Sequence, residues 1–493
     1  MPDGAASIEN VPYDEVDSAE YEGHWWLPAT PEDRVSGYLT ISAAGKAKLR
    51  LIGGFSSQHA AMHHGMVSKV NGHNDFALVH GRTTKHNEVT LVDAIQTQAS
   101  SRMFFDKISA QSLEPARVLF GIHLANPHDR TFTSATFMIE NFHAWAGTAG
   151  EVSYPLDDDD FSYRTATVRE QPESRVSIGD GLTLVVTNRL GLFSTRLSRS
   201  AAETACRTWT QLQIESSDPL EHNGFDEAIM SLADLVTFAT GEPSAVTEYA
   251  ITHQTPELRR RPVFEDELGI RSDEYDHTVS AAVRTQWLTT PGDDGTPPRD
   301  PHEYLFTHAD LAIVECIPRW FDLRSRARRA IDMVLSLTYG KQTYLQTEVL
   351  ILATAAEALH RAIAPDTLRM QPADFERMMA TAMKGLDPTD REIIQNAIHN
   401  EPSYRERLID LARVPSAPAV STLVPDVAKW AKEVAQIRNG LAHSMASYLA
   451  KPEDLHHMVT LRQQTQLLLQ LVILAELKLP EEQQKYIVRH AGR

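Results

Sequence analysis

The chain has 493 residues, of which 42% are hydrophobic and 23% are charged, and its formal net charge at pH 7 is -19. This length is enough for roughly two to four domains, each with a core of its own. The composition excludes a generally disordered or collagen-like chain. The acidic balance argues against a protein that coats nucleic acid non-specifically, because such binding depends on clustered Lys and Arg. The cysteines, Cys206 and Cys316, are too few for a disulfide scaffold or a Cys-based zinc site.

No segment has the pattern of a membrane span or a secretory signal. The longest apolar run, Leu467–Leu477, is too short and too interrupted to span a bilayer. Residues 1–20 are acidic and contain no apolar stretch typical of a signal peptide. We therefore expect a cytoplasmic protein that does not contact a membrane.

Up to about residue 250 the chain has the pattern of short β-strands. The segments are β-branched or alternate between apolar and polar residues, and Gly, Asn, Asp or Pro bounds each of them. They are residues 37–41, 46–54, 75–83, 87–94, 116–124 and 182–188. Turn residues at short intervals predict an antiparallel sandwich or barrel-like domain over residues 1–250. One predicted helix, near residues 224–241, interrupts it.

Residues 251–301 are predicted to connect this region to the rest of the chain, because residues 287–301 are crowded with Pro, Gly and Asp. From residue 302 to residue 493 the apolar residues recur at helical spacing. The predicted helices are residues 309–340, 343–363, 373–386, 425–443 and 454–479. The fold class that we expect is α+β, with a β-rich N-terminal domain followed by an all-α helical bundle.

The densest basic stretch lies in the first of these helices and contains Arg319, Arg324 and Arg328. We favour a solvated helix face as its interpretation. The alternative is a phosphate-facing patch, in which these three arginines would bind RNA.

A short motif near the end of the fourth predicted helix contains Arg438, Asn439, Gly440 and His443. On an ideal helix, an Arg and a His five residues apart lie about 140° apart and roughly 7.5 Å along the axis. A bend or helix end at Gly440 is one way to bring the two side chains together. Arg binds phosphate oxygens and His exchanges a proton near neutral pH, which are the two functions that metal-free RNA cleavage requires. The alternative is a helix C-cap with a cation near the negative end of the helix dipole.

The motif resembles the Rx4-6H motif of HEPN domains. Residues 343–361 resemble the earlier HEPN helix that carries an acidic residue, here Glu357 or, as the alternative, Glu348. Residues 403–412 resemble the segment between the two.

The N-terminal half resembles a second family domain. Residues 21–54, followed by residues 80–94, are similar to the N-terminal domain of ApeA-type abortive-infection proteins. That family joins a β-rich domain to a C-terminal HEPN ribonuclease, in the order that this chain shows.

The resemblance implies a catalytic pair, Arg438 and His443, with Asn439 as the polar neighbour and Glu357 as the residue that orients one of them. It implies a metal-independent RNA endonuclease without a cofactor, with tRNA as the substrate class. It further implies a homodimer through the C-terminal helices and a phage-derived trigger sensed by the N-terminal region. Ser444 follows His443, where relatives often have an aromatic residue. The alternative is a non-catalytic HEPN-type module that binds nucleotide, RNA or protein.

Two further groups of residues have structural interpretations. Histidines between His59 and His86 lie beside turn residues without a carboxylate or Cys at a metal-ligand spacing, so we expect no metal site there. Trp25, Trp26 and Trp145 have the residue type that stacks on bases, but we expect them to pack in the core.

Overall fold

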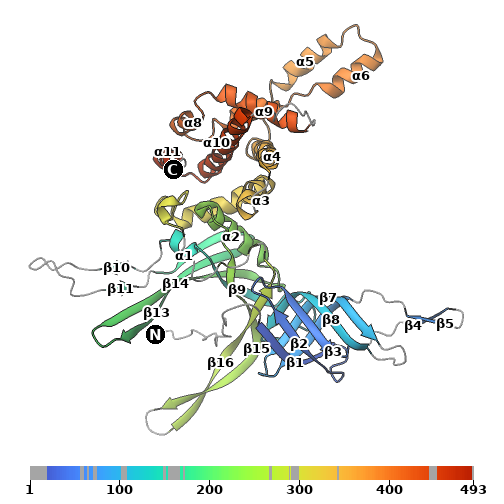
Figure 1. The fold of residues 1–493 in the computed structure, drawn as a ribbon, viewed down its shortest axis with the longest axis vertical. Coiled ribbons are helices and arrows are strands. Elements are labelled where there is room, and N and C mark those ends of the chain that lie inside the picture. Colours follow the sequence, from blue (N-terminus) through green and yellow to red (C-terminus); the bar gives the residue numbers. More distant parts are fainter. Residues whose placement is uncertain are drawn as a thin grey trace, which may run out of the picture. The chain divides into compact units, whose positions relative to one another are not determined.

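The computed structural model forms two units (Figure 1). It describes residues 19–55, 60–63, 66–69, 75–101, 108–147, 151–153, 167–169, 172–265, 269–287, 289, 292, 299–340, 344–442 and 452–490. The first unit is Met1–Val236 with Pro243–Pro301, and the second is Thr237–Glu242 with His302–Arg493. The first unit is rich in strands and the second is helical, which confirms the predicted fold class.

A closed barrel of six antiparallel strands forms one half of the first unit. Its strands are β1 (Ala19–Trp26), β2 (Val35–Ile41), β3 (Ala47–Ile52), β6 (Asp75–Thr83), β7 (Glu88–Ser101) and β8 (Ile108–Phe120). They follow the order β8-β3-β2-β1-β6-β7, and the pairing of β7 with β8 closes the ring. Closure removes the free strand edges that an open sheet would expose.

The barrel interior is built around Trp25, which is fully buried. Gly81 faces it on β6, where a Cβ would lie only 2.2 Å from a ring carbon of Trp25. The indole Nε1 donates a hydrogen bond to the Gly37 carbonyl at 3.3 Å. Trp26 and Trp145 are also buried, so the expectation of core packing for the three tryptophans is confirmed.

The same sheet continues beyond the barrel in the order β16-β15-β9-β14-β13-β12, through the pairing of β16 with β8. The strands of this part are β9 (Phe132–Ile139), β12 (Ser174–Gly179), β13 (Leu182–Leu197), β14 (Ala202–Leu220), β15 (Val246–Glu265) and β16 (Gly269–Thr285). Two short hairpins lie outside this sheet, β4 (Ala60–His63) with β5 (Met66–Lys69) and β10 (Glu151–Ser153) with β11 (Thr167–Arg169). The helices of the region are α1 (Phe142–Trp145) and α2 (Asp226–Thr240), the latter close to the helix predicted over residues 224–241.

The structure differs from the sequence-based division of the chain at residues 251–301. Most of β15 and all of β16 lie in this range, whereas the sequence pattern predicts a connecting region there. Pro256 and Pro262 within β15 argue against a strand at the level of sequence. The strand accommodates Pro256 at a register shift between Gln254 and Leu258, where the ladder with β16 is interrupted.

A buried polar cluster ties β8, α2 and β15 together. Arg117 of β8 is 6% exposed and forms an ion pair with Asp226, the first residue of α2. Its Nη1 donates a hydrogen bond to the carbonyl of His222 at 2.7 Å, and the Tyr249 hydroxyl donates to Asp226 Oδ1 at 3.0 Å. Burial raises the pKa of Asp226 although the Arg117 charge acts in the opposite direction.

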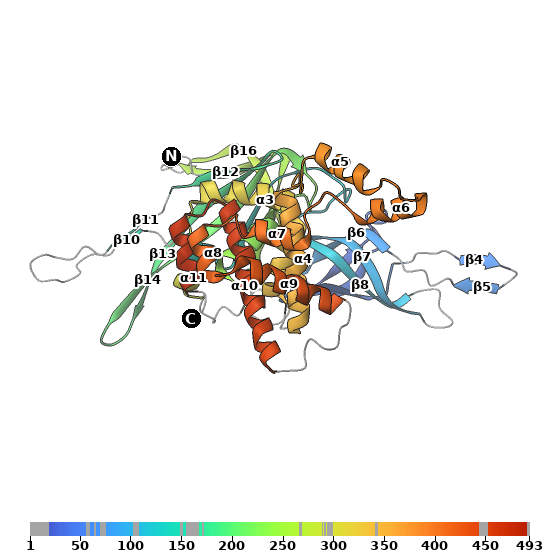
Figure 2. The same ribbon diagram turned by 90° about the horizontal axis from the view of Figure 1, so that it is seen from above.

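The second unit is a helical bundle in which α4 packs against α3, α7, α9 and α10. After a short 3-10 turn, Pro301–Glu303, its helices follow in chain order. They are α3 (Ile313–Tyr339), α4 (Leu345–Ile363), α5 (Pro372–Ala382), α6 (Pro388–Ala397), α7 (Tyr404–Leu411), α8 (Ala417–Leu423), α9 (Val427–Ala442), α10 (Pro452–Glu476) and α11 (Glu481–His490). Figure 2 shows α5 and α6 as a hairpin at the margin of this unit. Among the residues described above, no helix combines the length and the apolarity that crossing a bilayer requires.

Candidate active site

Helix α9 carries the arginine of the motif, and its apolar face fixes where that arginine lies. Trp430, Val434 and Ile437 recur at helical spacing and are at most 5% exposed. The Trp430 indole Nε1 donates a hydrogen bond to Thr465 Oγ1 of α10 at 3.3 Å. Arg438 follows Ile437 directly and lies beside this buried face, and its side chain is partly exposed to solvent.

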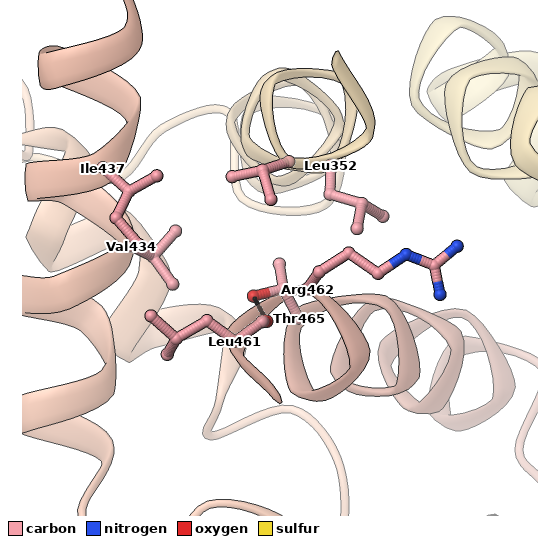
Figure 3. Close-up of a pocket in the computed structure, with 7 residues that line it drawn as sticks. Leu352, Val434, Ile437, Leu461, Arg462 and Thr465 are labelled. Carbon is pink, nitrogen blue, oxygen red and sulfur yellow. Dashed lines mark hydrogen bonds between the residues drawn. The ribbon is translucent and has the colours of Figure 1, made fainter. Parts of the chain in front are cut away.

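Figure 3 shows the contact of α9 with α4 and α10. Leu352 of α4 and Leu461 of α10 meet Val434 and Ile437 there, around a void of about 10 Å³. Such a void holds at most one water molecule. The region is therefore packed core, which holds the axis of α9 in place and offers no ligand site of its own.

The guanidinium of Arg438 lies where α4, α7 and α9 meet. Its Nη2 is 3.5 Å from Glu357 Oε2 on α4. Its Cζ lies 5.1 Å from the ring centroid of Tyr404 on α7, within the range of a cation–π contact. Its Nη1 donates a hydrogen bond to Asn439 Oδ1 at 3.3 Å. Arg438 remains 41% exposed, so the cation is oriented by protein groups and still open to a ligand.

Tyr404 is a site residue that the sequence analysis missed. Its hydroxyl donates a hydrogen bond to the Ala353 carbonyl of α4 at 3.0 Å, which fixes the ring beneath Arg438. Burial raises the pKa of the Tyr404 hydroxyl, so the phenol stays neutral and remains a donor. The feature that could have identified Tyr404 is its position as the first residue of a capped helix.

A capping box begins α7 and thereby places Tyr404. The Ser403 hydroxyl accepts from the Glu406 amide, and Glu406 Oε2 accepts from the Ser403 amide at 2.6 Å. Arg369 adds an ion pair to Glu406 at 2.9 Å. The hydrogen bonds from Ser403 are the main reason why the pKa of the Glu406 carboxyl is lowered to about 2.

We expect this cap to make the stability of the helical unit depend on acid pH. Because the folded pKa of Glu406 lies below its ordinary value of 4.5, its contribution is complete above about pH 4.5 and is lost as the pH falls toward 2. Glu406→Gln keeps an acceptor for the capping box but loses the charge, so it should lower the free energy of unfolding at pH 7 by less than about 1 kcal/mol. Urea unfolding should show this difference shrinking between pH 4.5 and pH 3. Glu376→Gln, at an exposed acid of α5, serves as the control and should show no such convergence.

A chain of charged groups continues from Glu357 away from Arg438. Arg361 lies 3.4 Å from Glu357 and 3.1 Å from Glu401, whose carboxylate also meets Arg407 at 2.8 Å. These contacts hold Glu357 between two guanidiniums. No local sequence pattern indicates these contacts, because Glu401 precedes α7 and belongs to no motif.

The inner end of this network is His360, which is 1% exposed. Arg407 Nη1 lies 3.1 Å from His360 Nδ1, and because a guanidinium only donates, Nδ1 must accept. The ring proton therefore lies on Nε2, which faces Asp410 Oδ2 at 3.5 Å. Burial lowers the pKa of His360, in agreement with a neutral ring. His360 is thus a structural histidine beneath the site.

The predicted site residues are partly brought together. Arg438, Asn439 and Glu357 meet as described, whereas His443 lies outside the described residues. The alternative acid, Glu348, pairs instead with Arg462 of α10, whose Nε lies 2.7 Å from Glu348 Oε2. The bend or helix end that we considered at Gly440 is not seen in the described helix, because α9 continues through this glycine to Ala442.

The arginines predicted on α3 form contacts within the chain. Arg319 pairs with Glu315 at 3.1 Å and donates to the Leu477 carbonyl, and Arg324 pairs with Asp332 at 2.9 Å. Arg328 lies 3.9 Å from Asp332 and is the most exposed of the three, at 59%. A role in RNA binding stays a prediction for these residues.

The histidines of the N-terminal half show no metal-ligand geometry where the structure describes them. His59, His64 and His73 lie outside the described residues. His80 Nε2 donates to the Leu124 carbonyl at 2.8 Å, and its ring stacks on His123. Within the described part of the chain, no group of three or more His, Cys, Asp or Glu side chains is placed to hold a metal ion.

Two family models match this sequence. The model for ApeA N-terminal domain 1 matches residues 20–320, which is well over half of the chain. The model for Apea-like HEPN matches residues 350–483. The second match includes Glu357, Tyr404 and Arg438, whereas Glu348 lies just before it. Neither the curated proteins nor the solved structures yielded a match.

Proposed function

Because the chain belongs to the ApeA-like family, which joins an ApeA N-terminal domain to an Apea-like HEPN domain, we propose that it is a metal-independent RNA endonuclease that cleaves tRNA. HEPN domains are generally ribonucleases, so the helical unit is an RNA-related module. One observation carries the proposal furthest. Arg438 is held by Glu357 and Tyr404 while its guanidinium remains open to solvent, as a phosphate-binding arginine requires.

The proposed reaction is a transesterification within the RNA strand. The ribose 2′-oxygen bonds to phosphorus and loses its proton to a base, while the bond from phosphorus to the 5′-oxygen breaks and that oxygen gains a proton. The products are a 2′,3′-cyclic phosphate and a 5′-hydroxyl. His443 would transfer a proton, and Arg438 would stabilise the charge that develops on the phosphoryl oxygens. Glu357 and Asn439 would orient Arg438.

The proposal includes a homodimer through the C-terminal helices. Helix α9 is regular from Val427 to Ala442. A bend at Gly440 therefore does not turn Arg438 toward the same face as the residues that follow it in the chain. A twofold contact between two copies solves this problem, because the arginine of one subunit then works with the histidine of the other. The N-terminal unit would restrain the nuclease until a phage-derived trigger is sensed, and cleavage of tRNA would then arrest translation in an abortive infection.

The decisive measurement incubates the purified protein with total tRNA in the presence of EDTA. We expect discrete fragments with 2′,3′-cyclic phosphate ends, since no metal takes part in the proposed reaction. Activity per chain should fall on dilution in step with the dimer fraction measured by mass photometry. Binding without cleavage would instead support an RNA-binding regulator, and a fully active monomer would contradict the dimeric site. Because the proposed restraint could silence the purified protein without its trigger, RNA ends are also sequenced after brief induction in phage-infected cells, and binding counts as evidence for a regulator only if the cyclic-phosphate ends are missing from both assays.

A further inference from the structure

The far end of the β13–β14 hairpin is a two-stranded ribbon that extends beyond its sheet (Figures 1 and 2). Strand β12 pairs with β13 only as far as Val186, and β9 pairs with β14 only from Leu212 onward. Residues 189–207, which we call the arm, therefore have no third strand beside them in the described part of the chain. At about 3.3 Å per residue the arm is roughly 25 Å long.

The arm is basic within an acidic protein. It contains Arg189, Arg196, Arg199 and Arg207 but a single acidic residue, Glu203, whereas the whole chain has a net charge of -19. All four arginines are exposed. None of them forms an ion pair with another described residue, unlike the arginines of α3, so their charge is available to an external anion.

Large apolar side chains lie among these arginines. Leu192 is 95% exposed, Leu197 is 78% exposed and Phe193 is 58% exposed. Phe193 is paired with Cys206 and Leu197 with Ala202, so both side chains lie on one face of the ribbon. An isolated hairpin is only marginally stable in water, and natural proteins rarely leave such edges and apolar groups uncovered. A partner is therefore expected to cover this face.

We propose that the arm is an RNA-binding element that contacts the same RNA that the nuclease cleaves, an inference that rests on the proposed function. Exposed arginines suit phosphate oxygens, which they can bind through two parallel N–H donors. Phe193 offers a ring on which an unpaired base can stack, and some nucleic-acid-binding proteins insert apolar side chains such as Leu between bases. The excess of positive charge favours RNA over a protein partner.

The test measures tRNA binding by fluorescence anisotropy in the full-length Arg438→Ala protein, which leaves the RNA uncut. Arg196→Glu combined with Arg199→Glu should weaken binding about tenfold or more. It should also reduce the slope of log K against log salt concentration by about two, one for each lost phosphate contact. Arg50→Glu combined with Lys85→Glu, at exposed barrel positions, makes the same change in net charge and should bind almost as the parent does. Equal binding by the two double variants would overturn the inference.

The apolar face is tested separately. Phe193→Ser combined with Leu197→Ser should weaken tRNA binding about fivefold while leaving the salt slope unchanged, because stacking is lost without any charge. Unchanged tRNA binding together with lost protection against phage would indicate a protein partner and would overturn the RNA assignment. The two proposals fail separately. If tRNA is cleaved normally and the arm variants bind it as the parent does, only the proposed role of the arm is contradicted. If tRNA binding depends on the arm but no assay detects cleavage, only the proposed nuclease activity is contradicted.

Discussion

Arg117→Ala is expected to destabilise the N-terminal unit by about 3 to 5 kcal/mol. Arg117 is buried and forms an ion pair with Asp226, whose side chain is 27% exposed, so its removal leaves a largely desolvated carboxylate without its cation. Tyr249 still donates one hydrogen bond to Asp226, but a single neutral donor does not replace the charge. Hydrogen exchange of the β8 and α2 amides measures the effect within this unit, where the two units need not unfold together.

The pH dependence of that defect follows from Asp226. Its folded pKa is already raised by burial, and removing Arg117 raises it further. A carboxyl whose pKa is raised in the folded state does not destabilise the fold at a pH below its ordinary pKa of 3.8, where it is protonated in both states. It lowers the free energy of unfolding most once the pH exceeds its folded pKa. The loss of stability should therefore be smaller at pH 4 than at pH 7.

Two controls separate this mechanism from a general loss of charge. Arg82→Ala breaks an exposed pair with Glu88 at 3.1 Å and should cost less than about 1 kcal/mol. Adding Asp226→Asn to Arg117→Ala should recover part of the lost stability, because the stranded charge disappears. If the double variant is as unstable as the sum of the single variants, the buried pair is not the cause.

The sequence predicted those parts of the fold whose apolar pattern has one buried face. Residues 75–83 were predicted as a strand and are β6, and residues 182–188 lie in β13. The rest of β13 escaped prediction because the arm is exposed on both faces, so its residues do not alternate between apolar and polar. Strand β15 escaped because its prolines argue against a strand.

The residues of the candidate site were likewise predicted only where a local sequence pattern marks them. Arg438 and Asn439 were found because they belong to a contiguous motif, and Glu357 because its helix resembles a known one. Tyr404 and Glu401 enter the site only through packing of α7 between α4 and α9, which no local pattern encodes. The choice between Glu357 and Glu348 also depended on geometry, since both are acids of the same helix and only the fold brings one of them to Arg438.

Arg438→Ala and His443→Ala are each expected to lower the rate of tRNA cleavage by a factor of about 10² to 10⁴. Arg438→Lys should restore little of it, because an ammonium cannot fork onto two phosphate oxygens or lie flat on the Tyr404 ring. Tyr404→Phe keeps that ring and should stay active, whereas Tyr404→Leu should lose activity through a misplaced Arg438. The matched control is Arg405→Ala on the same helix as Tyr404, whose guanidinium bonds only to the Ala428 carbonyl among the described residues and should be dispensable.

Mixing the two inactive variants tests whether the site is shared between subunits. If Arg438 of one copy acts with His443 of the other, a heterodimer of Arg438→Ala and His443→Ala contains one site with both native residues. Co-expressed or exchanged subunits should then recover a substantial fraction of native cleavage, although each variant alone is inactive. Within a single subunit no such site can form, because every chain lacks one of the two groups. Absence of recovery in a confirmed heterodimer would therefore place both groups in one chain, and the regular course of α9 to Ala442 would then require a turn directly after it.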